Sequence, residues 1–176
     1  MKWIGISGGW RKTNKEIENL VRETVREIIT RGDGIISGGA LGVDSIVLDE
    51  AVKLDKTGAQ IKIFIPANLE TYASHYRRRA KEGVITKAQA ESLIEQLADL
   101  KNLNPNSLIE NNSNEIIDKE AYYKRNSEVV AASDELIAFR IKTEASEGMG
   151  TKDTIDKAEQ KGIPVRVFQF DLTKEK

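Results

Sequence analysis

Short apolar runs alternate with longer stretches of helical periodicity along most of the chain, and this alternation restricts the possible folds more than any other feature. The predicted strands are the runs at 2–6, 35–36, 61–65, 135–139 and 165–168. Apolar residues recur at helical spacing up to Arg31 and again between 43 and 54. Parallel strands need crossover helices, and these helices cover both faces of the sheet. The sequence therefore predicts an α/β fold with a parallel sheet between two layers of helices.

The composition limits the class of protein. A chain of 176 residues can bury one substantial core, so we predict a single domain over 1–176. The absence of cysteine fits a reducing compartment, and the cytoplasm is the expected location. No apolar run approaches the length of a membrane span, so no membrane partner is expected. The net charge of -1 means that any polyanion would have to bind a local basic patch.

The middle of the chain departs from the strand and helix rhythm. Between about 69 and 120 the sequence predicts a charged helical stretch, a second helix near 86–100, and then the polar tract NLNPNSLIENNSNE. The polar composition of this tract predicts a loop or partial disorder. We interpret 69–120 as an insertion that serves as a lid, a dimer surface or a binding loop.

Three glycine turns follow predicted strands. The first two are Ser7-Gly8-Gly9 and Ser37-Gly38-Gly39, and the third, which opens a helix, runs from Gly148 through Gly150 to Thr151. Glycine lets an anion approach the backbone, while the free N–H groups of a helix N-terminus face that anion. The carboxyl ends of parallel strands meet at one edge of a sheet, so the three turns are expected to converge. They predict a site for a phosphate-bearing ligand.

Two common phosphate-binding motifs are absent from the sequence. No segment has the Walker spacing of glycine, four residues and Gly-Lys-Ser/Thr, and Gly8-Gly9 does not continue into GxGxxG. Nucleoside triphosphate hydrolysis and hydride transfer therefore lose most of their support.

Three segments resemble one known superfamily. They are IISGGALGVDSIVLDEA, YYKRNSEVVAASDELIAF and EGMGTKDTIDKAEQKGIPV, which together with the first strand cover most of the chain outside 69–120. They are similar to the motifs of the superfamily that joins DNA-processing protein A, the lonely-guy phosphoribohydrolases and the molybdenum-cofactor carrier-like proteins, with the DNA-processing branch most similar. The resemblance implies a Rossmann-like three-layer domain with a mostly parallel sheet and a helical and loop insertion. It also implies a homodimer that pairs through helices flanking the site.

The resemblance carries roles onto individual residues. It implies that a nucleotide phosphate or sugar phosphate is lined by Gly38, Gly39, Gly42, Gly150 and Thr151. Asp44 would accept from a ribose hydroxyl or from backbone N–H groups, and Arg125 and Asn126 would contact the ligand. No metal site and no required cofactor are expected, although a nucleotide ligand is. The expected function is binding of a nucleotide or nucleotide-derived ligand, with recognition favoured over turnover.

Two alternatives stay open. The first is phosphoribohydrolase activity, but Thr154 occupies the position of the glutamate that those enzymes use to cleave the N-glycosidic bond, which puts this activity in doubt. The second is binding of single-stranded DNA through the basic segment Arg77, Arg78 and Arg79, with Tyr72 and Tyr76 as stacking faces. Near the first glycine turn, Trp10 is a further candidate for stacking on a base.

Overall fold

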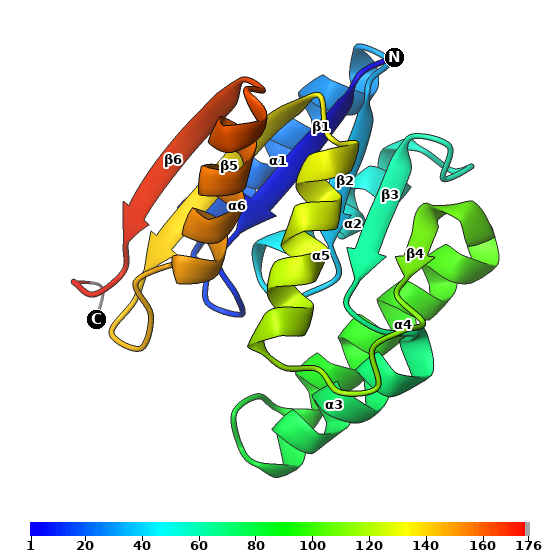
Figure 1. Cartoon of the computed structure of the whole chain (residues 1–176), viewed down its shortest axis with the longest axis vertical. Coiled ribbons are helices and arrows are strands. Elements are labelled where there is room, and N and C mark those ends of the chain that lie inside the picture. Colours follow the sequence, from blue (N-terminus) through cyan, green and yellow to red (C-terminus); the bar gives the residue numbers. More distant parts are fainter. Residues whose placement is uncertain (175–176) are drawn as a thin grey trace.

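The computed structural model describes residues 1–174, and these residues form one parallel sheet between helical layers (Figure 1). Its strands lie in the order β4-β3-β2-β1-β5-β6, and all neighbouring strands run parallel. The described strands are β1 (Trp3–Gly8), β2 (Gly34–Gly38), β3 (Ile61–Ile65), β4 (Leu108–Glu110), β5 (Glu135–Lys142) and β6 (Val165–Asp171). The predicted α/β class and Rossmann-like architecture are confirmed, and the sheet is parallel throughout rather than mostly parallel.

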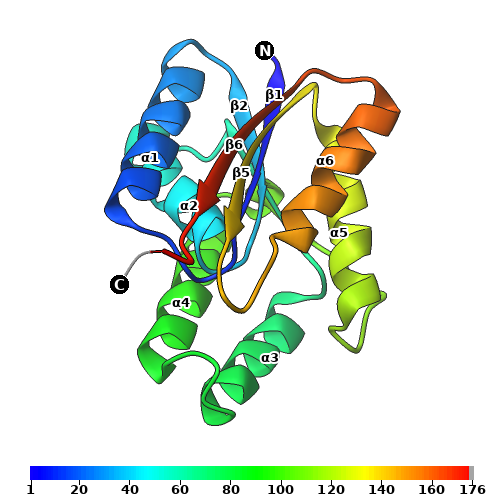
Figure 2. The same cartoon turned by 90° about the vertical axis from the view of Figure 1, so that its left-hand side faces the viewer.

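Helices cover the two faces of the sheet in pairs. α1 (Lys15–Thr30) packs beside α2 (Val43–Leu54) on one face, and α5 (Lys119–Ala132) beside α6 (Met149–Lys161) on the other. Figure 2 shows the two pairs on opposite sides of the strands. The chain order reverses at β1, because β2 lies on one side of it and β5 on the other. In such sheets this switch point, at the carboxyl ends of the strands, is where ligands bind.

α1 shows how the sequence pattern becomes structure. The Asn14 side chain caps the helix by accepting a hydrogen bond from the Ile17 N–H at 2.8 Å. Every third or fourth residue after that, including Ile17, Val21, Val25 and Ile28, is buried against the sheet. The helical stripe read from the sequence is therefore the core face of α1.

The insertion is more ordered than the sequence predicts. α3 (Leu69–Lys81) and α4 (Lys87–Leu103) lie beyond the carboxyl ends of β2 and β3, and the short helix η1 (Pro105–Ser107) follows them (Figure 1). The prediction of a loop or disorder for NLNPNSLIENNSNE is wrong for its first part, which contains the end of α4, η1 and β4, and β4 pairs with β3. Residues 111–115 form neither helix nor strand. Leu108 is buried there, and the Ser107 hydroxyl donates to the Gly58 carbonyl at 2.6 Å.

A charge network joins α1 to α2. Glu50 is 5% exposed and accepts hydrogen bonds from Arg22 at 2.9 Å and from Arg26 at 2.8 Å. Burial alone would raise the pKa of Glu50, but the hydrogen bonds from Arg26 and Arg22 outweigh it and lower that pKa. The charged carboxylate is therefore the form that the fold stabilises.

We expect Glu50→Gln to lower the free energy of unfolding by about 1–3 kcal/mol, because charge-assisted hydrogen bonds are lost at a buried position. Because the folded-state pKa is lowered, this contribution is present above the pKa of the unfolded chain and is lost as pH falls through the folded value. Denaturant unfolding of both proteins at neutral and acidic pH measures it. Glu18→Gln, on the exposed side of the same network, is the control and should cost less than about 1 kcal/mol. Equal losses in the two variants would contradict the prediction.

Candidate functional site

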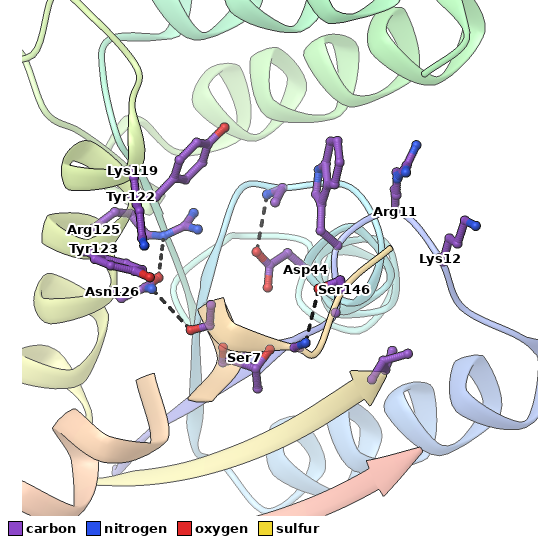
Figure 3. A pocket seen from close by; sticks show the side chains of 18 of the residues that line it. Ser7, Arg11, Lys12, Asp44, Lys119, Tyr122, Tyr123, Arg125, Asn126 and Ser146 are labelled. Carbon is purple, nitrogen blue, oxygen red and sulfur yellow. Dashed lines mark hydrogen bonds between the residues drawn. The ribbon is translucent and has the colours of Figure 1, made fainter. Parts of the chain in front are cut away.

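A cavity of about 620 Å³ lies at the switch point of the sheet (Figure 3). Its walls come from the turns after β1, β2 and β5, from the first half of α5, and from α3. The described lining residues are Ser7, Gly8, Gly9, Trp10, Arg11, Lys12, Ala40, Asp44, His75, Arg79, Ile117, Asp118, Lys119, Tyr122, Tyr123, Arg125, Asn126, Ile141, Thr143, Ala145, Ser146, Gly148, Gly150 and Thr151. The size suits a small ligand or one nucleotide of a longer chain.

The first two glycine turns contact each other through the backbone. Gly42 has a φ of 90°, and a Cβ there would collide with the carbonyl oxygen of Gly9. The Val43 N–H donates to that carbonyl at 3.1 Å, and the Arg11 N–H donates to the Leu41 carbonyl at 3.1 Å. These bonds hold the turns side by side, with Trp10 bridged to Gly42.

Two buried tyrosines of α3 support the second turn. The Tyr72 hydroxyl donates to the Gly39 carbonyl at 2.9 Å. The Tyr76 hydroxyl lies 3.4 Å from the Leu41 N–H and 3.2 Å from Trp10 Nε1, both of which donate to it. Each tyrosine is only 1% exposed, so the suggestion that they offer stacking faces to DNA is wrong. They attach α3 to the glycine edge instead.

An acidic and a basic side chain meet at the floor of the cavity. Asp44 accepts from the Ser37 hydroxyl at 2.9 Å and from the Ala40 N–H at 3.4 Å. Burial raises the pKa of Asp44, and the nearby Arg125 charge opposes that rise. Gly38 makes room for both groups, because a Cβ there would lie 2.7 Å from Arg125 Cζ and 2.7 Å from Asp44 Oδ2.

Beside this floor lies a polar cavity of about 20 Å³, lined by Ile6, Ser7, Gly38, Asp44, Arg125, Asn126, Val129 and Thr154. The Thr154 hydroxyl donates to the Gly150 carbonyl at 3.2 Å, and this residue does not line the larger cavity. A threonine hydroxyl carries no negative charge, so it cannot take the role of a catalytic carboxylate.

The third glycine turn presents the N-terminus of α6 to the cavity. Gly148 caps this helix with a φ of 70°, and no side chain caps the free N–H groups of the first turn. A Cβ on Gly150 would meet no described atom within 4 Å, so space beside this turn is open. Asn126 reaches the turn from α5, with its Nδ2 3.4 Å from the Gly150 carbonyl and 3.2 Å from Asp153 Oδ2. Uncapped N–H groups next to open space can bind an anion.

One face of α5 supplies aromatic rings and a lysine that the sequence reading missed. Lys119, Tyr122, Tyr123 and Asn126 all line the cavity, and their spacing of three, four and seven residues places them on one helical face. The Tyr123 ring lies 5.2 Å from Lys119 Nζ. The Tyr122 hydroxyl is 3.3 Å from His75 Nε2, which holds its ring against α3. The sequence does show a polar helical stripe with aromatic residues at these positions. Such a stripe usually faces solvent, so it does not by itself indicate a binding site.

The lining is positively charged overall. Its basic side chains are Arg11, Lys12, Arg79, Lys119 and Arg125, of which the sequence reading named Arg79 and Arg125. In Figure 3, Arg11 and Lys12 lie across the pocket from Lys119 and Arg125. Its acidic side chains are Asp44, buried on the floor, and Asp118, which caps α5 by accepting from the Ala121 N–H at 2.9 Å. The local potential therefore favours anions.

The structure brings most of the predicted site residues together. The predicted residues that line the cavity are Ser7, Gly8, Gly9, Asp44, Arg125, Asn126, Gly148, Gly150 and Thr151. Gly38 borders the small cavity beside it. Ser37, Gly39 and Gly42 line neither cavity, because they pack the turns against the sheet, α4 and each other.

The predicted basic segment splits in the structure. Arg79 lines the cavity, whereas Arg77 pairs with Glu91 of α4 at 2.9 Å and Arg78 does not reach the lining. Side chains on one helix point in different directions, so three consecutive arginines cannot all face one ligand.

Among residues 1–174, no cluster of His, Cys, Asp or Glu side chains has the arrangement of a metal site. The same residues include no helix long and apolar enough to cross a membrane.

Comparisons with known proteins relate this geometry to a family. Residues 2–176 match the family model described as DNA recombination-mediator protein A. DNA processing protein A from Helicobacter pylori, studied for its single-stranded DNA binding mode, has a similar structure, with a TM-score of 0.66 and 21% identity. The match covers 94% of this chain and 64% of that one, so this chain spans less than two thirds of its length.

Two further structures share the fold. DNA processing protein A from Streptococcus pneumoniae matches with a TM-score of 0.61 and 16% identity, over 94% of this chain and 50% of that one. The protein TM1055 matches with a TM-score of 0.55 and 16% identity, over 94% and 72%. A comparison with curated protein sequences gives no match.

We expect Gly38→Ala to lower the free energy of unfolding by about 1–3 kcal/mol, because the added methyl group overlaps Arg125 and Asp44. Gly150→Ala is the matched control, since its methyl group would enter open space within a helix. It should leave stability unchanged or raise it by up to about 1 kcal/mol. Thermal or denaturant unfolding measures both changes. A Gly38→Ala protein as stable as the wild type would contradict the prediction, because the floor of the cavity would then have room for a methyl group.

Proposed function

The chain belongs to the DNA recombination-mediator protein A family, and on that premise we propose that it binds single-stranded DNA by holding a nucleotide of the strand in the cavity. The observation that carries the proposal is the lining itself, which combines cationic and aromatic side chains at the carboxyl edge of the sheet. Proteins that bind single strands use this pairing of backbone charge contacts with base stacking. The likeness to the Helicobacter pylori protein, described as binding single-stranded DNA, supports the same assignment.

Each part of the nucleotide has a chemical partner in the cavity. The phosphate fits between the first turn of α6, with its uncapped N–H groups, and the Ser7-Gly8-Gly9 turn. Tyr122, Tyr123 and Trp10 offer ring faces for the base, and Trp10 is 38% exposed at the rim. Lys119 and Arg79 would contact neighbouring phosphates of the strand.

A free nucleotide or nucleotide-derived phosphate is the second candidate. The observation that favours it is the volume of the cavity, about 620 Å³, which falls within the range of small-molecule sites. Both candidates place a phosphate at the same turns, and the length of the ligand distinguishes them.

Fluorescence anisotropy with a labelled oligo-thymidylate tests the proposal. We expect Gly150→Asp to weaken binding about tenfold or more, because it places a negative charge on the phosphate position. Lys119→Ala and Arg79→Ala should each weaken binding several-fold and reduce the slope of log affinity against log salt concentration by about 0.7. Arg77→Ala, whose side chain is paired with Glu91 away from the cavity, is the matched control and should bind as the wild type does.

The same assay separates the two candidates. Displacement of the oligonucleotide by thymidine monophosphate at similar concentration would favour the free nucleotide. Binding that survives Gly150→Asp, Lys119→Ala and Arg79→Ala together would show that the cavity is not the binding site.

Protonation of His75 should strengthen binding of the same oligonucleotide. This half-buried side chain lines the cavity, and burial together with Arg78 and Arg79 lowers its pKa below 6.5, while Glu82 acts in the opposite direction. A bound phosphodiester favours the protonated imidazole, so affinity should rise roughly fivefold as pH falls through that pKa. Thymine and phosphodiester groups keep their charge in this range. His75→Gln should remove the pH dependence, and a pH profile unchanged by that substitution would contradict the assignment.

A further inference from the structure

The three consecutive arginines of α3 differ in how their charges are used. Arg77 pairs with Glu91 at 2.9 Å, and Arg79 pairs with Glu82 at 3.1 Å. Arg78 is exposed, and within residues 1–174 its side chain takes part in no ion pair or hydrogen bond. A guanidinium carries five N–H donors in a planar fork that suits a phosphate. The donors of Arg78 are therefore available to an anion from outside the fold.

Arg78 lies close to the cavity without lining it. His75 and Arg79 line the cavity, and Arg78 and Arg79 follow His75 by three and four residues. Both arginines are therefore neighbours of His75 on the helix surface, on opposite flanks. Burial lowers the pKa of His75 most, and the charge of Arg78 lowers it more than that of Arg79, whereas Glu82 raises it. The charge of Arg78 thus acts at the cavity mouth.

A single strand that places one nucleotide in the cavity has to leave it over a rim. On the α3 side the rim is formed by His75 and Arg79, and His75 Nε2 lies 3.3 Å from the Tyr122 hydroxyl of α5. Every nucleotide of the strand carries a negative charge, so a phosphate beyond the rim favours a nearby cation. Arg78 lies there, beside His75, with no acidic partner among the described residues.

We propose that Arg78 binds a phosphate outside the cavity, the one that follows the phosphate at Arg79, so that the strand leaves the cavity across α3. The inference rests on the proposed function, in which the cavity holds a nucleotide of single-stranded DNA. Consecutive helix residues point about 100° apart, so Arg79 and Arg78 reach different phosphates. Arg77 points to Glu91 of α4 and takes no part. The site then favours a strand over a free nucleotide.

The end of α3 offers a purely structural reason for its arginines. Basic side chains in the last turn of a helix interact favourably with the helix dipole, and α3 has Arg78, Arg79 and Lys81 there. This reason makes a different prediction for Arg78→Ala, which would lower the melting temperature and leave the affinity for every ligand unchanged. Binding and stability measured on the same variants therefore distinguish the two roles.

Competition against the labelled oligo-thymidylate tests the inference with ligands of increasing length. The competitors are thymidine monophosphate, a tetramer and a decamer, at pH 8, where His75 is neutral because its pKa lies below 6.5. We expect Arg78→Ala to weaken binding of the tetramer and the decamer about two- to fivefold. It should also reduce the slope of log affinity against log salt concentration by about 0.7. Binding of the monophosphate should not change, because this ligand has no phosphate beyond the rim.

Two variants are the matched controls. Arg77→Ala removes the neighbouring arginine, whose charge is already paired with Glu91, and it should bind all three competitors as the wild type does. Arg78→Lys keeps the positive charge and should keep the salt slope. The melting temperature of each variant shows whether the fold is unchanged.

The position of Arg78 can be tested without any ligand. His75 is the only histidine of the chain, so its NMR signals can be assigned directly. Arg78→Ala removes a nearby positive charge and should raise the pKa of His75, whereas Arg77→Ala should leave it unchanged. A pKa of His75 that is the same in Arg78→Ala and in the wild type would contradict the placement of Arg78 at the cavity mouth.

The outcomes separate this inference from the proposed function. If Gly150→Asp weakens binding of the decamer and Arg78→Ala does not, the strand leaves the cavity elsewhere, and only the role of Arg78 is refuted. If Gly150→Asp has no effect, the cavity is not the binding site, and both proposals fail. Equal losses for the monophosphate and the decamer, or for Arg77→Ala and Arg78→Ala, would also overturn the inference. Arg78 would then act through the general field of α3 and not on a phosphate beyond the rim.

Discussion

The close backbone contact between the first two glycine turns is the constraint on which the rest of the site depends. Gly42 lies against the Gly9 carbonyl in a backbone conformation that side chains disfavour, and this contact lets the segments that follow the paired strands β1 and β2 lie side by side. Trp10 and Arg11 on one turn and Asp44 after the other then face a common space. The Gly9 N–H donates to the Phe139 carbonyl at 3.2 Å and so joins the first turn to β5, the strand that precedes the third turn.

A nearly neutral chain produces a basic cavity by distributing its charges unevenly. In the network on α1 and α2, Glu50 and Asp49 pair with Arg22 and other cations that do not line the cavity. Around the cavity the cations outnumber the acids, and Asp44 is buried beneath Arg125. Net charge therefore says little about the potential at one face of a protein, which depends on where acids are already paired.

The sequence was informative wherever local chemistry and periodicity agreed. The helical stripe of α1, the glycine turns and their convergence at the carboxyl edge follow from the spacing of Ile17 to Ile28 and from the parallel topology. Predictions failed where tertiary packing determines which side chains are buried. Tyr72 and Tyr76 lie in a highly charged segment that looks exposed, yet they are buried because α3 turns that face toward the second glycine turn.

The same limit applies to β4 and to the α5 stripe. β4 is a strand because β3 offers a free edge to a tract that by itself is too polar to predict one. From the sequence, Lys119 and Tyr123 look like solvent-exposed helix residues. They line the cavity because the fold places the glycine turns opposite them. In each case the deciding partner lies far away in the sequence.

The attachment of α3 to the glycine edge makes part of the cavity wall depend on the packing of α3 and α4. α3 and α4 pack against each other as a hairpin, and α3 carries His75 and Arg79 into the lining. Every opening of this hairpin withdraws those groups and frees the loop that Tyr72 and Tyr76 support. The affinity for the proposed ligand would then include the fraction of molecules in which the hairpin is closed. Buried residues of α4 that do not line the cavity, such as Leu93 and Leu97, would thereby influence the affinity for the proposed ligand.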